Sequence, residues 1–164
     1  MIEINEAIPR GKAEMMYEMM RKAEFHHNDQ KERRGEFTYT AAFNDSPLAK
    51  EYDFHEGFLM LKPKLEAHFG HITDATVMAY RMDMHDHFDA HKDSHLGRGF
   101  VLYLSPEWQW DWGGLLVVDE GNGARAYKPE FNKAVLMDSP QTYHCVTKIE
   151  PHAPPRYAMV GFIK

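Results

Sequence analysis

The sequence Gly-Phe-Val-Leu-Tyr-Leu at residues 99–104 is one of about seven short, β-rich runs in the second half of the chain. The others are residues 75–82, 115–118, 124–127, 134–137, 145–149 and 157–163. Turn chemistry separates these runs, and Asn122-Gly123 favours a tight hairpin. No helical pattern lies between them, so they predict antiparallel strands arranged as a sandwich or barrel.

The first half of the chain has helical periodicity instead. After Pro9, apolar residues recur at three- and four-residue spacing from Met15 to Ala23, which predicts an amphipathic helix with methionines in the core. Residues 48–62 and 63–69 predict two further helical pieces, with Pro63 as the first residue of the second. Residues 28–48 are polar and turn-rich, and whether they form a lid is left open.

Together these patterns predict one domain, residues 1–164, of the mainly β (α+β) class. Residues 73–164 would form a double-stranded β-helix, or jelly roll, as the catalytic core. Residues 1–72 would form a mostly helical N-terminal support packed on its outside.

Composition excludes several classes of protein. The chain has 164 residues, 11 histidines, one cysteine and a formal charge of −6. One cysteine excludes a disulfide framework and a Cys-rich zinc module, so a bound metal would need imidazole and carboxylate ligands. The scattered basic residues argue against nucleic acid as a partner. No apolar run approaches the ~20 residues of a membrane span, and residues 1–10 lack the apolar segment of a signal peptide. We therefore expect a cytoplasmic protein without a membrane partner.

Residues 83–95 read Asp-Met-His-Asp-His-Phe-Asp-Ala-His-Lys-Asp-Ser-His, which places four histidines and four aspartates in one short segment. Residues i and i+2 of a strand project from the same face, so His91 and Asp93 would point toward one place. They supply two of the three ligands of a 2-His-1-carboxylate metal site. His144, at the start of a predicted strand, is the natural third ligand.

Other interpretations of the same segment stay open. The His-x-Asp pattern occurs three times, at His27/Asp29, His87/Asp89 and His91/Asp93. The first lies in a polar loop and is discarded, whereas the second competes with the third. His85, His87 and His144 are an alternative set that could bind Zn²⁺ in a hydrolase. A solvated polar loop without a ligand is the remaining interpretation.

The surrounding residues narrow this choice. Phe88 to Asp93 and Arg98 are followed, in an ordered set, by residues 101–108, 111–116, 129–137, 140–141, 144–146 and 156–162. The set resembles the 2-oxoglutarate and Fe(II)-dependent oxygenase superfamily, in particular its prolyl 4-hydroxylase-like branch. The resemblance covers about residues 75–164.

The resemblance implies a role for each matching residue. His91, Asp93 and His144 would be the iron ligands, and Arg156 would bind the distal carboxylate of 2-oxoglutarate. Tyr103 matches a position that often hydrogen-bonds the same carboxylate. The planar fork of an arginine suits this task because it pairs both carboxylate oxygens and keeps its charge. Tyr80 and Arg98 are candidates for contacting the substrate at the mouth of the site.

The resemblance also implies the reaction. With Fe(II), 2-oxoglutarate and O₂, the enzyme would hydroxylate an amino-acid, peptide or protein substrate and release succinate and CO₂. The alternatives are a non-catalytic jelly-roll sensor that binds a metal or an acidic metabolite, and the Zn²⁺ hydrolase. The choice among these substrates and the oligomeric state are left open, because a fold and a cofactor do not fix either.

Overall fold

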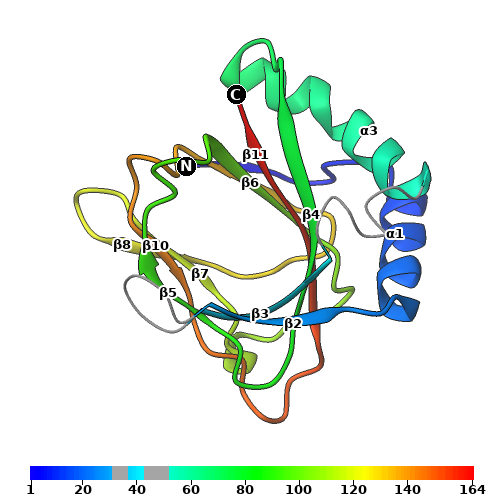
Figure 1. Cartoon of the computed structure of the whole chain (residues 1–164), viewed down its shortest axis with the longest axis vertical. Helices are drawn as coiled ribbons and strands as arrows, with labels where there is room; N and C mark the ends of the chain where they lie inside the picture. The colour runs from blue at the N-terminus through cyan, green and yellow to red at the C-terminus, as the bar shows by residue number, and fades with distance from the viewer. Residues whose placement is uncertain (31–36, 43–51) are drawn as a thin grey trace.

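The computed structural model describes residues 1–30, 37–42 and 52–164, with the side chains of residues 1–25 and 55–164 (Figure 1). Its helices are α1 (Arg10–Lys22), α3 (Tyr52–Phe69) and the short 3₁₀ helix η1 (Trp110–Trp112). Its strands are β1 (Ile2–Ile4), β2 (His26–Gln30), β3 (Phe37–Ala42), β4 (Ala75–Met82), β5 (Phe88–His91), β6 (Arg98–Tyr103), β7 (Leu116–Asp119), β8 (Ala124–Tyr127), β9 (Ala134–Met137), β10 (His144–Val146) and β11 (Arg156–Ile163).

The strands form two antiparallel sheets that face each other. The larger sheet has the order β1-β9-β6-β11-β4-β3-β2, and the smaller one has the order β5-β10-β7-β8. Helices α1 and α3 lie outside the larger sheet (Figure 1). This arrangement confirms the predicted jelly roll with external helices.

Alternation along the central strands separates two cores. Phe100 and Leu102 of β6 pack with Met16 and Leu65 of the helices. Their neighbours on β6, including Tyr103, point to the opposite face and pack between the two sheets. Successive side chains of a strand face opposite sides, so one strand serves both cores. The inner core contains the cavity described below.

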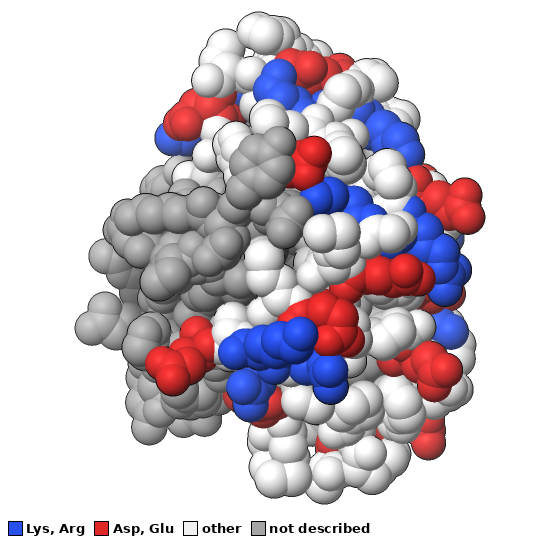
Figure 2. Space-filling model, turned by 90° about the vertical axis from the view of Figure 1, so that its right-hand side faces the viewer, with Lys and Arg blue, Asp and Glu red and all other residues white. Residues whose placement is uncertain are grey.

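On the face that carries the helices, basic and acidic side chains are interspersed (Figure 2). Several of them form ion pairs along one helix, such as Arg10 with Glu14 and Arg21 with Glu18. Exposed pairs of this kind contribute little to stability. Among the described helices, none combines the length and the hydropathy needed to cross a bilayer.

Two predictions about secondary structure need correction. Helix α3 is continuous through Pro63, whereas the sequence predicted two pieces. Proline removes the hydrogen bond to the Leu59 carbonyl, but Leu59 is 49% exposed, so water can satisfy that oxygen. Strands β1, β2 and β3 were not predicted. The turn-rich segment 28–48 contributes to a hairpin at the sheet edge, and its parts at 31–36 and 43–48, with the lid question, lie outside the described residues.

Asn132 joins the N-terminal segment to the jelly roll. Its side chain accepts a hydrogen bond from the Ile8 amide at 3.1 Å and donates one to the Ile8 carbonyl at 2.7 Å. The Ala7 amide donates to the Asn132 carbonyl at 2.9 Å. Asn132 is 4% exposed and has a φ of 58°, a left-handed conformation that asparagine tolerates better than most residues.

We expect Asn132→Ala to destabilise the protein by about 2–4 kcal/mol, because two buried backbone groups lose their partners and alanine is strained at this φ. Asn132→Gly removes the same hydrogen bonds without that strain, so its loss should be smaller. Urea unfolding followed by circular dichroism measures both values. An alanine variant as stable as the wild type would contradict the role of this side chain.

Candidate metal centre and anion pocket

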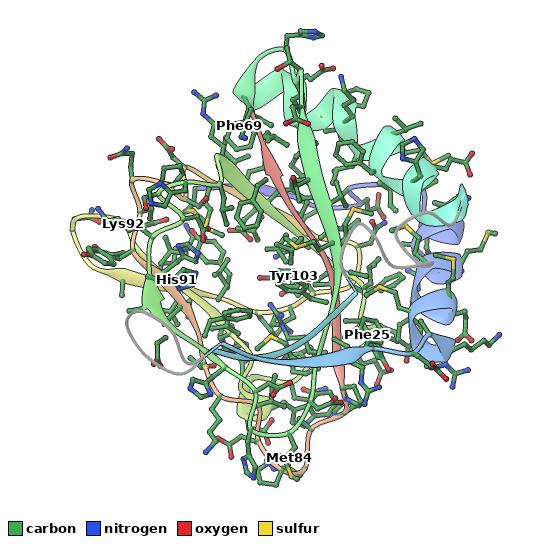
Figure 3. All side chains as sticks on the ribbon, viewed as in Figure 1. Phe25, Phe69, Met84, His91, Lys92 and Tyr103 are labelled. Carbon is green, nitrogen blue, oxygen red and sulfur yellow. The ribbon has the colours of Figure 1, made fainter. Side chains whose placement is uncertain are left out.

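A cavity of about 450 Å³ lies between the two sheets, and most of its lining is apolar. Its few ionisable or strongly polar side chains include His91, Asp93, His144, Tyr103 and Arg156. Figure 3 shows His91 and Tyr103 directed into the space between the sheets, while Lys92 lies at the periphery. His91, the last residue of β5, therefore points into the cavity while Lys92 points away from it, as the sequence predicted.

His91, Asp93 and His144 converge at one side of this cavity. Strands β5 and β10 are paired with His91 opposite His144, and Asp93 follows just after β5. One ligand atom from each of the three residues lies within 4.8 Å of the other two. The Asp93 carboxylate is 3.5 Å from His91 Nε2 and 3.3 Å from His144 Nε2.

Backbone carbonyls orient both imidazoles. His91 Nδ1 donates to the Asp89 carbonyl at 2.6 Å, and His144 Nδ1 donates to the Thr142 carbonyl at 3.1 Å. A carbonyl oxygen can only accept, so each Nδ1 carries a proton, and the Nε2 atom of each ring faces Asp93 as the atom that a metal ion would take. This outer contact is the usual way in which a metal-binding histidine is oriented.

Electrostatics prepare Asp93 as an anionic ligand. Burial opposes its ionisation, but the hydrogen bonds with His144 and His91 outweigh burial and hold the pKa of Asp93 well below its usual range. For His91, burial is again the largest single influence and disfavours the charged ring. The contacts with Asp93 and with the Asp89 carbonyl together outweigh burial, so the pKa of His91 is raised. Two imidazole nitrogens and one carboxylate fit a non-haem Fe(II) site of the 2-His-1-carboxylate type.

The competing ligand sets are not assembled. In the part of the chain that the structure describes, His91, Asp93 and His144 form the only cluster of three possible metal ligands. His87 Nδ1 contacts the His85 carbonyl at 3.1 Å, and His87 Nε2 is 3.7 Å from the Asp89 carboxylate. Neither His85 nor His87 joins His144, so the geometry does not support the Zn²⁺ alternative or the His87/Asp89 register.

Arg156 and Tyr103 form a second polar group in the same cavity. Arg156 is 3% exposed and Tyr103 is fully buried, with the guanidinium carbon 5.0 Å from the centre of the Tyr103 ring. Burial lowers the pKa of Arg156 and raises that of Tyr103. The Tyr103 hydroxyl and Arg156 Nε are buried without a hydrogen-bond partner. Such orphaned donors are costly, and a carboxylate ligand would satisfy both.

Gly114 has no side chain, and this leaves room for the Arg156 side chain. It has a φ of +64°, and a Cβ atom there would lie 3.1 Å from Arg156 Cδ and 2.5 Å from Ile149 Cδ1. Any side chain would therefore displace the arginine or the core residue beside it. Gly114, which precedes β7 in the chain, thus provides the space for Arg156 at this end of the cavity.

Of the two residues expected at the mouth of the site, Tyr80 lines the cavity and Arg98 does not. Tyr80 lines the cavity, and its ring stacks on Phe88 at 6.0 Å between centroids. Arg98 does not line it, because its neighbour Gly99 takes the inward position on β6. The Arg98 guanidinium instead donates to the Phe69 carbonyl at 2.8 Å and lies over the Phe69 ring at the end of α3. The expectation that Arg98 contacts the substrate is therefore not supported.

Met82 is the contact that sequence reasoning missed. It is fully buried, and its sulfur accepts a hydrogen bond from Arg156 Nη1 at 3.1 Å. The two residues are direct partners across β4 and β11. The signal that could have found it is the pairing register of these strands, which residue composition alone does not reveal.

Comparisons with known proteins agree with this geometry. The family model described as the 2OG-Fe(II) oxygenase superfamily matches residues 75–164. A search of curated proteins found no match.

Three similar solved structures each align with 99% of this chain. A Trichoplax adhaerens prolyl hydroxylase in complex with a hypoxia inducible factor peptide has TM-score 0.80 and 16% identity over 82% of its own chain. A Pseudomonas putida prolyl-4-hydroxylase has TM-score 0.71 and 17% identity over 91%. A collagen prolyl hydroxylase from Paramecium Bursaria Chlorella virus-1, in its 2OG complex, has TM-score 0.69 and 10% identity over 94%.

Proposed function

The chain belongs to the 2OG-Fe(II) oxygenase superfamily, and we propose that His91, Asp93 and His144 hold its Fe(II) while Arg156 and Tyr103 hold its 2-oxoglutarate. It is a dioxygenase that uses Fe(II), 2-oxoglutarate and O₂, and its fold is similar to that of prolyl hydroxylases. The observation that carries the residue assignment is the convergence of the metal cluster and the two orphaned donors on one cavity.

When bound, the metal and the cosubstrate would supply the oxidising chemistry, in which one oxygen atom of O₂ converts a substrate C–H to C–OH and the other enters succinate as 2-oxoglutarate loses CO₂. Arg156 pairs the distal carboxylate through its planar fork. Tyr103 remains protonated because burial raises its pKa, so its hydroxyl can donate to the same carboxylate. The apolar lining excludes water from this pair and strengthens both interactions.

The substrate that we propose is a peptide or protein segment. The Trichoplax neighbour was solved with a peptide fragment, and two other neighbours are prolyl hydroxylases of a bacterium and a virus. Tyr80, which lines the cavity, is a candidate contact for the bound ligand. The single cysteine, Cys145, leaves the chain without an internal disulfide, which supports a cytoplasmic location.

Anaerobic titration tests this proposal directly. Fe(II) and 2-oxoglutarate added together should give a visible charge-transfer band, and admission of O₂ with a peptide library should give succinate and a product heavier by one oxygen. Mass spectrometry detects both. A folded protein that shows neither the band nor succinate would overturn the proposal, whereas the band without any substrate-dependent succinate would favour the sensor.

Metal binding should weaken in acid. Because the contacts with Asp93 and the Asp89 carbonyl raise the pKa of His91, a proton competes for this imidazole at a higher pH than for an isolated histidine. The metal needs the neutral ring, so affinity is lost as pH falls below that pKa, by about tenfold per unit for each proton displaced. Mn²⁺ titration by calorimetry between pH 5.5 and 7.5 measures the slope. An affinity that does not change over this range would contradict the assignment.

A further inference from the structure

The Arg156 guanidinium donates a hydrogen bond to the sulfur of Met82, and its electrostatic contacts are with Tyr103. The distance from Arg156 Nη1 to the Met82 sulfur is 3.1 Å. Among the described side chains, no carboxylate lies within ion-pair distance of this guanidinium. Arg156 is thus a buried cation whose polar side-chain neighbours are the Met82 thioether and Tyr103, and neither of them carries a negative charge.

The strand register makes this contact part of the fold. Met82 and Arg156 are opposite each other at the ends of β4 and β11, so their side chains project from the same face of the larger sheet. Met82 has no exposed surface, which restricts its side chain to positions allowed by packing. The sulfur is therefore held beside the guanidinium and limits the orientations that the guanidinium can adopt.

The acceptor type matters as much as its position. A thioether sulfur is a weak acceptor and carries no charge. It can orient one Nη group while leaving the positive charge uncompensated and the remaining donors available. A carboxylate at the same position would pair the guanidinium and compete with an incoming carboxylate.

We propose that Met82 is a positioning residue that holds Arg156 for the distal carboxylate of the cosubstrate, and that its sulfur preserves the preference for a dicarboxylic 2-oxo acid. This inference rests on the proposed function. It predicts that substitutions at Met82 affect ligands with a distal carboxylate and spare those without one.

Calorimetry on Mn²⁺-loaded protein tests it without turnover. The probes are 2-oxoglutarate and 2-oxopentanoate, which has a methyl group in place of the distal carboxylate. Met82→Leu conserves volume and removes the acceptor, so 2-oxoglutarate should bind about 3–10-fold more weakly. Met82→Glu provides a competing carboxylate and should weaken it on the order of 100-fold. Neither variant should change the affinity for 2-oxopentanoate by more than about twofold. A change of this size is small compared with the effect of losing one hydrogen bond to a charged group.

Met159→Leu is the matched control, because Met159 is equally buried on β11 but packs in the outer core against the helices. It should bind both acids as the wild type does. If the Met82 variants bind both acids more weakly to the same extent, Met82 has a merely structural role and the inference is overturned. The inference is also overturned if both Met82 variants bind 2-oxoglutarate with wild-type affinity. If the wild type itself fails to bind 2-oxoglutarate, the proposed function falls and the inference falls with it.

Discussion

His91→Ala protein is expected to lose its metal site, and its turnover should fall by at least about 10³-fold relative to the wild type. His91 contributes one of two imidazoles in a cluster whose three ligand atoms lie within 4.8 Å of one another. Removal leaves one imidazole and one carboxylate, which cannot complete the 2-His-1-carboxylate set. Mn²⁺ calorimetry and the anaerobic absorption band measure the loss.

His87→Ala is the matched control for this experiment. His87 lies in the same segment and, like His91, contacts the carbonyl two residues before it, but it lies outside the cluster. Its variant should retain the metal and the band. If His87→Ala abolishes the band and His91→Ala does not, the ligand set is built on the His87/Asp89 register instead.

The sequence was sufficient for the architecture because the jelly roll depends on local patterns. Strands β4, β6 and β11 are mostly apolar, and each was predicted within about two residues of its observed bounds. Short apolar runs between turn residues are typical of buried strands. Strand β1, which pairs with the distant β9, and the hairpin of β2 with β3 were missed. His26–Gln30 has no apolar alternation and pairs by backbone hydrogen bonds at a sheet edge. The break expected at Pro63 was wrong because exposure of Leu59 makes the lost hydrogen bond tolerable.

The candidate site divides in the same way. His91 and Asp93 follow from a period of two, which sequence spacing reports directly. Spacing alone could not separate them from His87 and Asp89, because the choice depends on which histidine pairs with His144 across β5 and β10. Arg98 was expected just before a strand, whereas it is the first residue of β6 and does not line the cavity; the sequence does not report the face to which a strand-end side chain points.

Arg156→Leu is expected to weaken 2-oxoglutarate binding on the order of 10²–10³-fold while leaving Mn²⁺ affinity within about twofold of the wild type. The bidentate pair between a guanidinium and a carboxylate contributes two charge-assisted hydrogen bonds, which account for a loss of this size. The metal ligands are on β5 and β10 and just after β5, whereas Arg156 begins β11 in the other sheet, so the two sites separate experimentally.

Stability should move in the opposite direction to binding. Arg156 is 3% exposed, and this burial disfavours the charged guanidinium and lowers its pKa. Leucine removes that uncompensated charge and the orphaned Nε, so ligand-free Arg156→Leu should unfold at the same or a higher temperature than the wild type. Arg156→Lys keeps the charge but loses the planar fork, so it should bind 2-oxoglutarate with intermediate affinity. If Arg156→Leu binds 2-oxoglutarate normally, Arg156 is not part of the cosubstrate site. If the variant loses Mn²⁺ binding together with 2-oxoglutarate binding, Arg156 supports the fold instead.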